Sequence, residues 1–111
     1  MSKLPTLPEL GRVVEITRGR DKGLYCVVVG QEADRFVYVA DGDTRKAERP
    51  KKKNVLHVRN TPYIAHEVLD ELSAHGKVTN AKLRHAIRQY ESTRAETLET
   101  DAEGGMADGE R

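Results

Sequence analysis

The 111-residue chain is long enough for one compact domain, and its 37% hydrophobic and 33% charged residues make it more polar than an average globular protein. No apolar run approaches the roughly 20 residues that a membrane helix needs, and the N-terminus lacks the apolar core of a secretory signal. The single cysteine excludes an internal disulfide, and the four scattered histidines have no metal-ligand spacing. We therefore expect a cytoplasmic protein without a membrane partner, bound metal or cofactor.

The charge is divided unevenly along the chain. Residues 1–60 carry 13 basic and 8 acidic side chains, residues 61–90 carry 4 and 3, and residues 91–111 carry 2 and 7. A solvated charged surface explains most single charge runs, but a basic body with an acidic end favours a polyanionic partner for the body.

The first sixty residues have the pattern of a small β domain. Residues 1–10 contain two prolines and predict an irregular arm. From residue 11 to 60, short runs rich in β-branched and aromatic residues alternate with glycine-bearing or charged turns. The predicted strands are 12–16, 24–29, 36–40 and 55–58, with a basic connection over 44–54. Four short strands without helices predict an antiparallel β-barrel.

Three side chains on these strands allow two interpretations. Cys26 lies in an apolar run, which favours a small buried hydrophobe over a reactive thiol. Phe36 and Tyr38 share one face of a strand, and a barrel this small needs large side chains in its core. We therefore predict that both rings are buried, whereas an exposed face would let them stack on bases.

Residues 61–91 predict a helical hairpin. In the first helix, over 63–74, Ile64, Val68, Leu69 and Leu72 form an apolar stripe, and Gly76 ends it. Thr79 or Asn80 can cap the second helix. Its predicted inward-facing residues are Ala81, Leu83, Ala86, Ile87 and Tyr90. Packing on the barrel is favoured over packing on a partner, because two short helices are marginal alone. Residues 92–111 have few apolar side chains and predict a disordered acidic tail.

The most informative segment runs from Gly11 to Gly30. It resembles the KOW motif of ribosomal proteins and of NusG-type transcription factors, in which a glycine-bearing basic loop joins two strands. Gly23 stands at the defining glycine of that motif. The resemblance implies a barrel of the SH3-like kind and RNA binding by the loop. The predicted contact residues in this loop are Arg18, Gly19, Arg20, Lys22 and Gly23, since glycines allow a close approach to phosphates and the cations can bind them.

A second basic segment follows the Asp41–Asp43 turn. With the closing strand it is similar to KOW-containing large-subunit ribosomal proteins of archaea and eukaryotes, and to small bacterial KOW-domain RNA-binding proteins. The resemblance continues weakly over 79–84, and the acidic tail lies outside it, which favours an accessory factor over a core ribosomal subunit. The predicted RNA contacts in this segment are Arg45, Lys46, Arg49, Lys51, Lys52 and Lys53.

Taken together, these features predict a mostly β protein with a helical hairpin that binds rRNA or another structured RNA, as a monomer. No nucleophile, general base or phosphate-binding loop forms a catalytic arrangement, so we do not expect an enzyme. The alternative is a protein-interaction module that docks on a ribosomal or transcription-complex protein. RNA binding through several phosphates weakens steeply with salt, whereas an apolar helix interface changes little.

Overall fold

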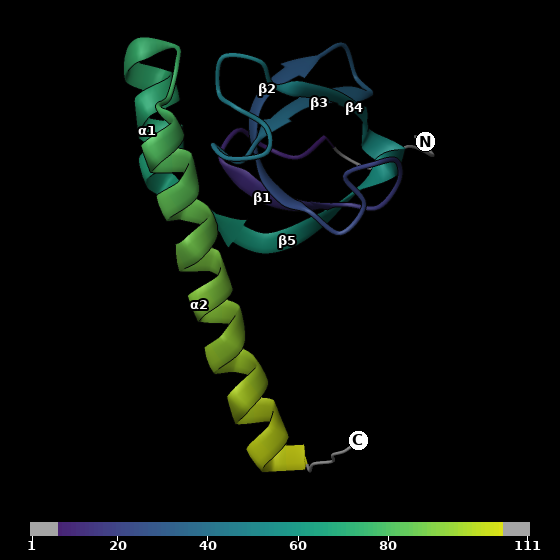
Figure 1. Cartoon of the computed structure of the whole chain (residues 1–111), viewed down its shortest axis with the longest axis vertical. Coiled ribbons are helices and arrows are strands. Elements are labelled where there is room, and N and C mark those ends of the chain that lie inside the picture. Colours follow the sequence, from purple (N-terminus) through teal and green to yellow (C-terminus); the bar gives the residue numbers. More distant parts are fainter. Residues whose placement is uncertain (1–6, 106–111) are drawn as a thin grey trace.

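The computed structural model describes residues 7–105, with side chains described as far as residue 94. Five strands precede two helices (Figure 1). Among the described residues, no helix combines the length and the apolar character needed to cross a bilayer. The elements are β1 (Arg12–Ile16), β2 (Tyr25–Glu32), β3 (Phe36–Ala40), β4 (Lys51–Asn54), the 3₁₀ turn η1 (Val55–His57), β5 (Val58–Ile64), α1 (His66–His75) and α2 (Asn80–Gly105).

The strands form one antiparallel sheet in the order β4-β3-β2-β1-β5. This sheet is curved but not closed, so the prediction of a closed barrel is wrong. β5 pairs with β1 through Ile16 and Val58, and β4 pairs with β3 through Val37 and Lys53. The two edge strands are joined directly by η1 and do not pair with each other. Consecutive lysines on β4 suit an open edge, because charge discourages further strand pairing.

Two elements differ from the predicted strand pattern. Residues 51–54, three lysines and an asparagine, form β4 instead of part of a connecting loop, and the predicted strand 55–58 is mainly the turn η1. β5 continues to Ile64, four residues beyond the predicted end of the β domain at residue 60. Pro62 is compatible with this assignment because β5 lies at the edge of the sheet.

The inner face of the sheet holds the first hydrophobic cluster. Residues Leu7, Leu10 and Leu24 pack against it from the arm and the β1–β2 loop, and Pro8 is fully buried beside them. Cys26 is completely buried there, as predicted, and burial raises the pKa of its thiol to about 12. The cluster consists of Val14, Ile16, Cys26, Val28, Val37 and Val39.

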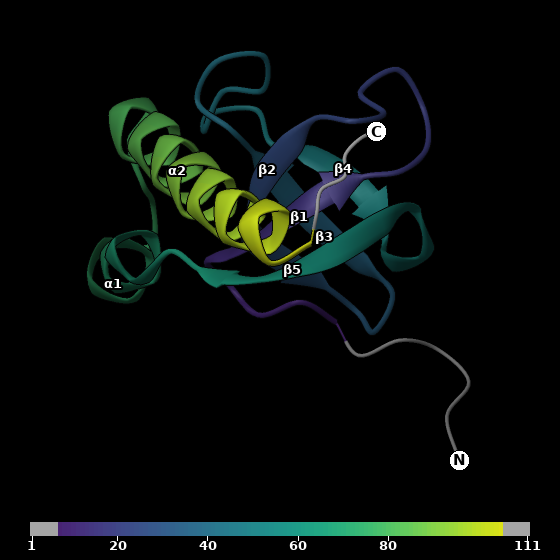
Figure 2. The ribbon, with the colours of Figure 1, turned by 90° about the horizontal axis from the view of Figure 1, so that it is seen from below.

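The outer face is covered by the helices at one end only. Val13, Val27 and Ala40 of the sheet share a second cluster with both helices, which confirms the prediction that the hairpin packs on the β domain. Figures 1 and 2 show α1 and α2 on one side of the sheet, while β3 and β4 extend away from them. The buried helical members are Val68, Leu83, Ala86 and Tyr90.

Several details of the hairpin differ from the prediction. α1 begins at His66, because Ile64 still pairs with Arg12 of β1 and the Ala65 N–H donates to the Gly11 carbonyl at 2.7 Å. Ala81, predicted to face inward, is exposed. Gly76 ends α1 in the left-handed conformation at φ +74°, as predicted.

α2 is longer than the sequence predicted. It continues to Gly105, where an irregular tail was expected from residue 92. The apolar content of residues 92–105 is low, but five of these residues are alanine or glutamate, which are strong helix formers. Residues 106–111 of the predicted tail lie outside the described residues.

Candidate nucleic-acid interface

The β1–β2 loop, residues 17–24, is held by a compact set of backbone bonds. The Gly23 N–H donates to the Ile16 carbonyl at 2.8 Å, and the Lys22 N–H donates to the Gly19 carbonyl at 3.2 Å. Gly19 and Gly23 adopt φ of +94° and +91°, a region that other residues enter at a cost. The glycines therefore set a fixed loop shape.

The cations of this loop project from it. Arg18, Arg20 and Lys22 are exposed, and no ion pair engages their side chains within the part of the chain that the structure describes. On a loop of fixed shape, free cations lose less conformational entropy when they bind phosphates.

The structure brings part of the second basic segment beside this loop. Lys53 of β4 donates from Nζ to the Arg18 carbonyl at 3.1 Å, and the Thr17 N–H donates to the His57 carbonyl at 2.9 Å. β4 and η1 thus lie against the loop. We call Arg18, Arg20, Lys22, Lys51 and Lys53 the basic edge.

Three predicted contact residues have other partners or places. Arg45 Nε lies 2.7 Å from Asp21 Oδ2, and this hydrogen bond raises the pKa of the Arg45 guanidinium. Lys46 and Arg49 lie on the turn that contacts the start of α2, where the Ala47 N–H donates to Asn80 Oδ1 at 2.7 Å. We interpret Arg45 as a link between the second basic segment and the β1–β2 loop. Lys46 and Arg49 lie apart from the basic edge.

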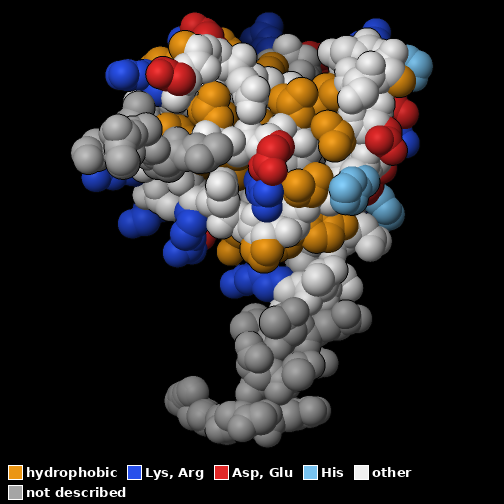
Figure 3. Space-filling view, turned by 180° about the vertical axis from the view of Figure 1, so that it is seen from behind, with side chains coloured by type: hydrophobic (Ala, Val, Ile, Leu, Met, Phe, Trp, Pro, Cys, Tyr) orange, Lys and Arg blue, Asp and Glu red, His pale blue; other side chains and the backbone are white. Residues whose placement is uncertain are grey.

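Lys52 is oriented differently from its neighbours. Its Nζ lies 4.5 Å from the centroid of the Phe36 ring and 3.3 Å from Glu32 Oε2. Because side chains alternate along a strand, β4 places Lys52 on one face and Lys51 and Lys53 on the other. The three lysines therefore serve two surfaces. In Figure 3, the view from behind, more Lys and Arg side chains gather on the left than on the right, where the histidines lie.

Phe36 and Tyr38 are half-buried on the outer face, so the prediction that they belong to the core is wrong. Their neighbours Val37 and Val39 are buried in the inner cluster, and the alternation of β3 turns the two rings outward. The Tyr38 hydroxyl donates to Glu32, which raises the pKa of Tyr38 and lowers that of Glu32.

The Asp41–Asp43 turn supports the interface from the helical side. Asp41 Oδ1 accepts from the N–H groups of Asp43 and Arg45 at 3.0 and 2.8 Å. Gly42 has φ +81°, and a Cβ there would lie 2.3 Å from the Asn80 carbonyl oxygen. Arg84 Nη1 donates to the Gly42 carbonyl at 2.8 Å. Helix α2 is thereby seated directly on the turn.

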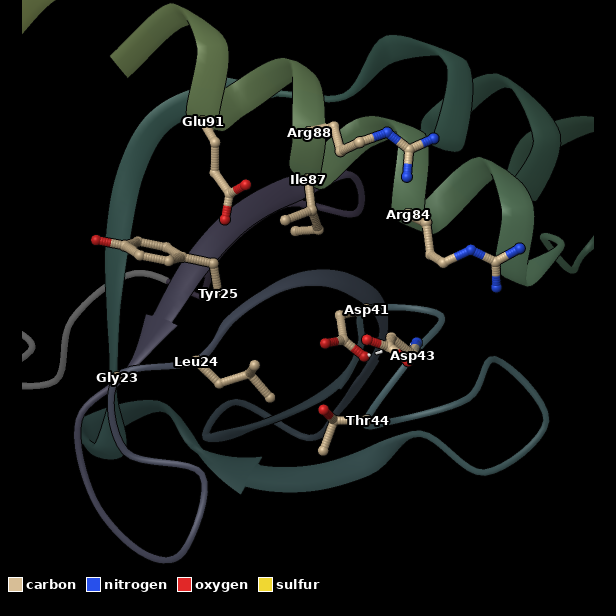
Figure 4. Close-up of a pocket in the computed structure, with 10 residues that line it drawn as sticks. All are labelled: Gly23, Leu24, Tyr25, Asp41, Asp43, Thr44, Arg84, Ile87, Arg88 and Glu91. Carbon is tan, nitrogen blue, oxygen red and sulfur yellow. Dashed lines mark hydrogen bonds between the residues drawn. The ribbon is translucent and has the colours of Figure 1, made fainter. Parts of the chain in front are cut away.

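A cleft of about 330 Å³ lies between this turn, the end of the β1–β2 loop and α2 (Figure 4). Arg84 and Arg88 line it from the helix, while Asp43 and Glu91 bring the opposite charge. Opposite charges in one cleft favour neither an anion nor a cation. Over the described residues, no three His, Cys, Asp or Glu side chains gather to hold a metal ion.

Sequence reasoning missed the outward aromatic pair and the seat of α2. The outward orientation of the pair could have been predicted, because Val37 and Val39 form a more uniformly aliphatic face than Phe36 and Tyr38. The contact of Gly42 with Asn80 had none, since it joins residues 38 positions apart and depends on backbone approach.

Comparison with known proteins identifies the class. The family model described as the KOW motif matches residues 10–39, which run from the end of the arm into β3. The chain belongs to the family of KOW-motif proteins. A relative from Bacillus subtilis (strain 168), described as "Putative ribosome-binding protein YbzG", is 31% identical over 71 residues. That match covers 64% of this chain and 96% of the relative.

Proposed function

We propose that the protein is a ribosome-associated, non-enzymatic factor of the cytoplasm that binds rRNA through its basic edge. Membership of the KOW family and the description of the Bacillus relative as ribosome-binding support this function. The observation that carries it is that Arg18, Arg20 and Lys22, beside Lys53, are exposed and form no ion pair with the residues that the structure describes. These groups can each meet a separate phosphate and release its counterions.

Docking on a ribosomal protein is the alternative, and the helices argue against it. That function would need an exposed apolar stripe on the hairpin. Val68 and Leu83 are completely buried against the sheet, and Ile64, Leu69 and Leu72 are half-buried, so little of the stripe is left for a partner. A phosphate-rich partner fits the exposed side chains better.

The test is co-sedimentation with ribosomes through a sucrose cushion over a series of salt concentrations. The variant Arg18→Ala/Arg20→Ala/Lys22→Ala should bind at least about tenfold more weakly. The number of phosphate contacts derived from the salt dependence of its affinity should fall by about 3. The matched control, Lys77→Ala/Lys82→Ala/Arg88→Ala, removes the same charge from the helical side and should bind like the wild type. An equal loss of affinity in both variants, or an affinity that does not change with salt concentration, would overturn the proposal.

A further inference from the structure

The outer face of the sheet has a bare end, which we call the aromatic face. Its residues are Gly30, Glu32, Phe36, Tyr38 and Lys52. The two rings belong to neither hydrophobic cluster, although they lie on the same side of β3 as Ala40, which the helices bury. The two half-buried rings thus lie beyond the helices and outside both hydrophobic clusters of the described residues.

Tyr38 is seated on the sheet by a glycine. Gly30 pairs with Tyr38 directly after a register shift between Val28 and Gly30. A Cβ at Gly30 would lie 3.3 Å from Tyr38 Cδ2 and 3.4 Å from Tyr38 Cβ, so the ring packs closely over the bare backbone. A larger residue at position 30 would push the ring away. The arrangement fixes the ring while its hydroxyl stays at an exposed position.

The aromatic face carries its own cation. Lys52 lies over the Phe36 ring, and Glu32 accepts hydrogen bonds from both Lys52 and Tyr38. The next residue, Lys53, bonds to the β1–β2 loop on the other side of the strand. β4 therefore joins the aromatic face to the basic edge, and a chain of phosphates that follows β4 meets both.

We propose that Phe36 and Tyr38 form a stacking platform for unpaired RNA bases, whose phosphates bind along β4. This inference rests on the proposed function and specifies its ligand as RNA with unpaired nucleotides. The two rings can stack on bases while the flexible Lys52 ammonium beside them binds a phosphate. Stacking of this kind does not depend on the base sequence. Bases within a duplex are already stacked and offer no free face, so the platform discriminates against double-stranded RNA.

The experiment compares Phe36→Leu/Tyr38→Leu with Tyr38→Phe by fluorescence anisotropy. The probes are a short unstructured RNA oligonucleotide and a duplex of the same length. The double variant should lose about tenfold or more in affinity for the single strand and keep its affinity for the duplex. Tyr38→Phe keeps the ring and removes only the hydroxyl, so its affinity for the single strand should stay well above that of the double variant.

Ultraviolet crosslinking of the wild-type protein to the same single strand gives a readout that needs no variant. The expected adduct, located by mass spectrometry, is on Phe36 or Tyr38. Unchanged single-strand affinity in the double variant, equal loss on both probes, or adducts confined to the 17–24 loop would overturn the platform. In those cases wild-type binding to ribosomes would still stand, whereas wild-type failure to bind ribosomes or RNA would reject the proposed function itself.

Discussion

The two ends of the outer sheet face differ in what covers them. At one end, Val13, Val27 and Ala40 lie beneath α1 and α2 and are fully buried. At the other end, Phe36 and Tyr38 lie beyond the helices among polar neighbours. Small aliphatic residues allow a helix to approach the sheet closely, whereas large rings and a lysine would hold it away.

This contrast divides one continuous face into a structural part and a part that we propose binds RNA. The boundary falls on β3 between Tyr38 and Ala40, two residues apart on the same face. We expect substitutions on the helix-covered end to change the free energy of unfolding. We expect substitutions on the bare end to change RNA binding instead.

The largest effect should come from truncating a side chain of α2 that packs on the covered end of the sheet. Leu83 is completely buried in the outer cluster, so Leu83→Ala removes contacts and leaves a cavity. We expect a loss of about 3 kcal/mol in the free energy of unfolding, measured by urea denaturation. Ile87→Ala, at a half-buried position of the same helix, should cost about half as much. Similar losses in Leu83→Ala and in Phe36→Leu/Tyr38→Leu would remove the distinction between the two ends.

The seat of α2 should be the next most sensitive feature. Gly42→Ala places a Cβ 2.3 Å from the Asn80 carbonyl oxygen at φ +81° and should destabilise the fold by about 2 kcal/mol. Gly23→Ala is the matched control, with φ +91° and nothing within 4 Å of the added atom. It should cost only the backbone strain, about 1 kcal/mol. Equal urea midpoints for the two variants would mean that the contact with α2 is not tight.

The inner face supplies a test that depends on pH. Burial raises the pKa of Cys26 from its ordinary 9.0 to about 12, so the folded state keeps a proton that the unfolded state releases. The stabilisation is complete below pH 9 and is lost as the pH rises from there towards 12. Cys26 should lower the free energy of unfolding by about 1 kcal/mol per pH unit in that range.

Cys26→Ala provides the reference for that measurement, because it lacks this group but retains the other titrating side chains. The difference between the two urea curves should change with pH only above about 9. The native thiol should also resist alkylation at pH 8 and react once the protein is unfolded in urea. Rapid alkylation of the folded protein would contradict the buried position.

Much of the fold could be predicted because the local sequence pattern and the tertiary packing favour the same elements. The strands over 12–16 and 36–40, the glycine-shaped loop and the helix stop at Gly76 all follow from composition and turn residues. β4 could not be predicted in this way. A run of three lysines looks like a loop, and an edge strand with little buried surface needs no apolar pattern to reveal it.

The residues of the candidate site could be predicted in part, but their arrangement could not. The loop cations Arg18, Arg20 and Lys22 were identified from the motif, and the structure leaves them exposed. For Arg45, charge and the resemblance predict RNA contact, but neither predicts the bond to Asp21, which lies 2.7 Å away across 24 residues of sequence. The rings at 36 and 38 were assigned to the core because a small domain needs large residues, a need that the helices satisfy with Tyr90 and Leu83.

The smallest predicted effect concerns Glu32 on the bare end. Its carboxylate accepts from Lys52 and from Tyr38, so it holds the lysine on the free protein and adds a negative charge beside the rings. Glu32→Gln removes that charge while it keeps a hydrogen-bond acceptor for Tyr38. Affinity for the single-stranded RNA probe should rise about two- to threefold at low salt, because Lys52 becomes free to bind a phosphate.

Asp34→Asn is the matched control for Glu32→Gln, since it removes one exposed acid from the adjacent turn, where Asp34 is 3.8 Å from Arg35. Its effect on affinity should be smaller, because Arg35, the cation that it frees, is not part of the aromatic face. The gain in Glu32→Gln should also disappear when Lys52 is replaced by alanine. If the gain persists without Lys52, only the general charge has changed, and the coupling of lysine, glutamate and ring on the bare end is not needed for RNA binding.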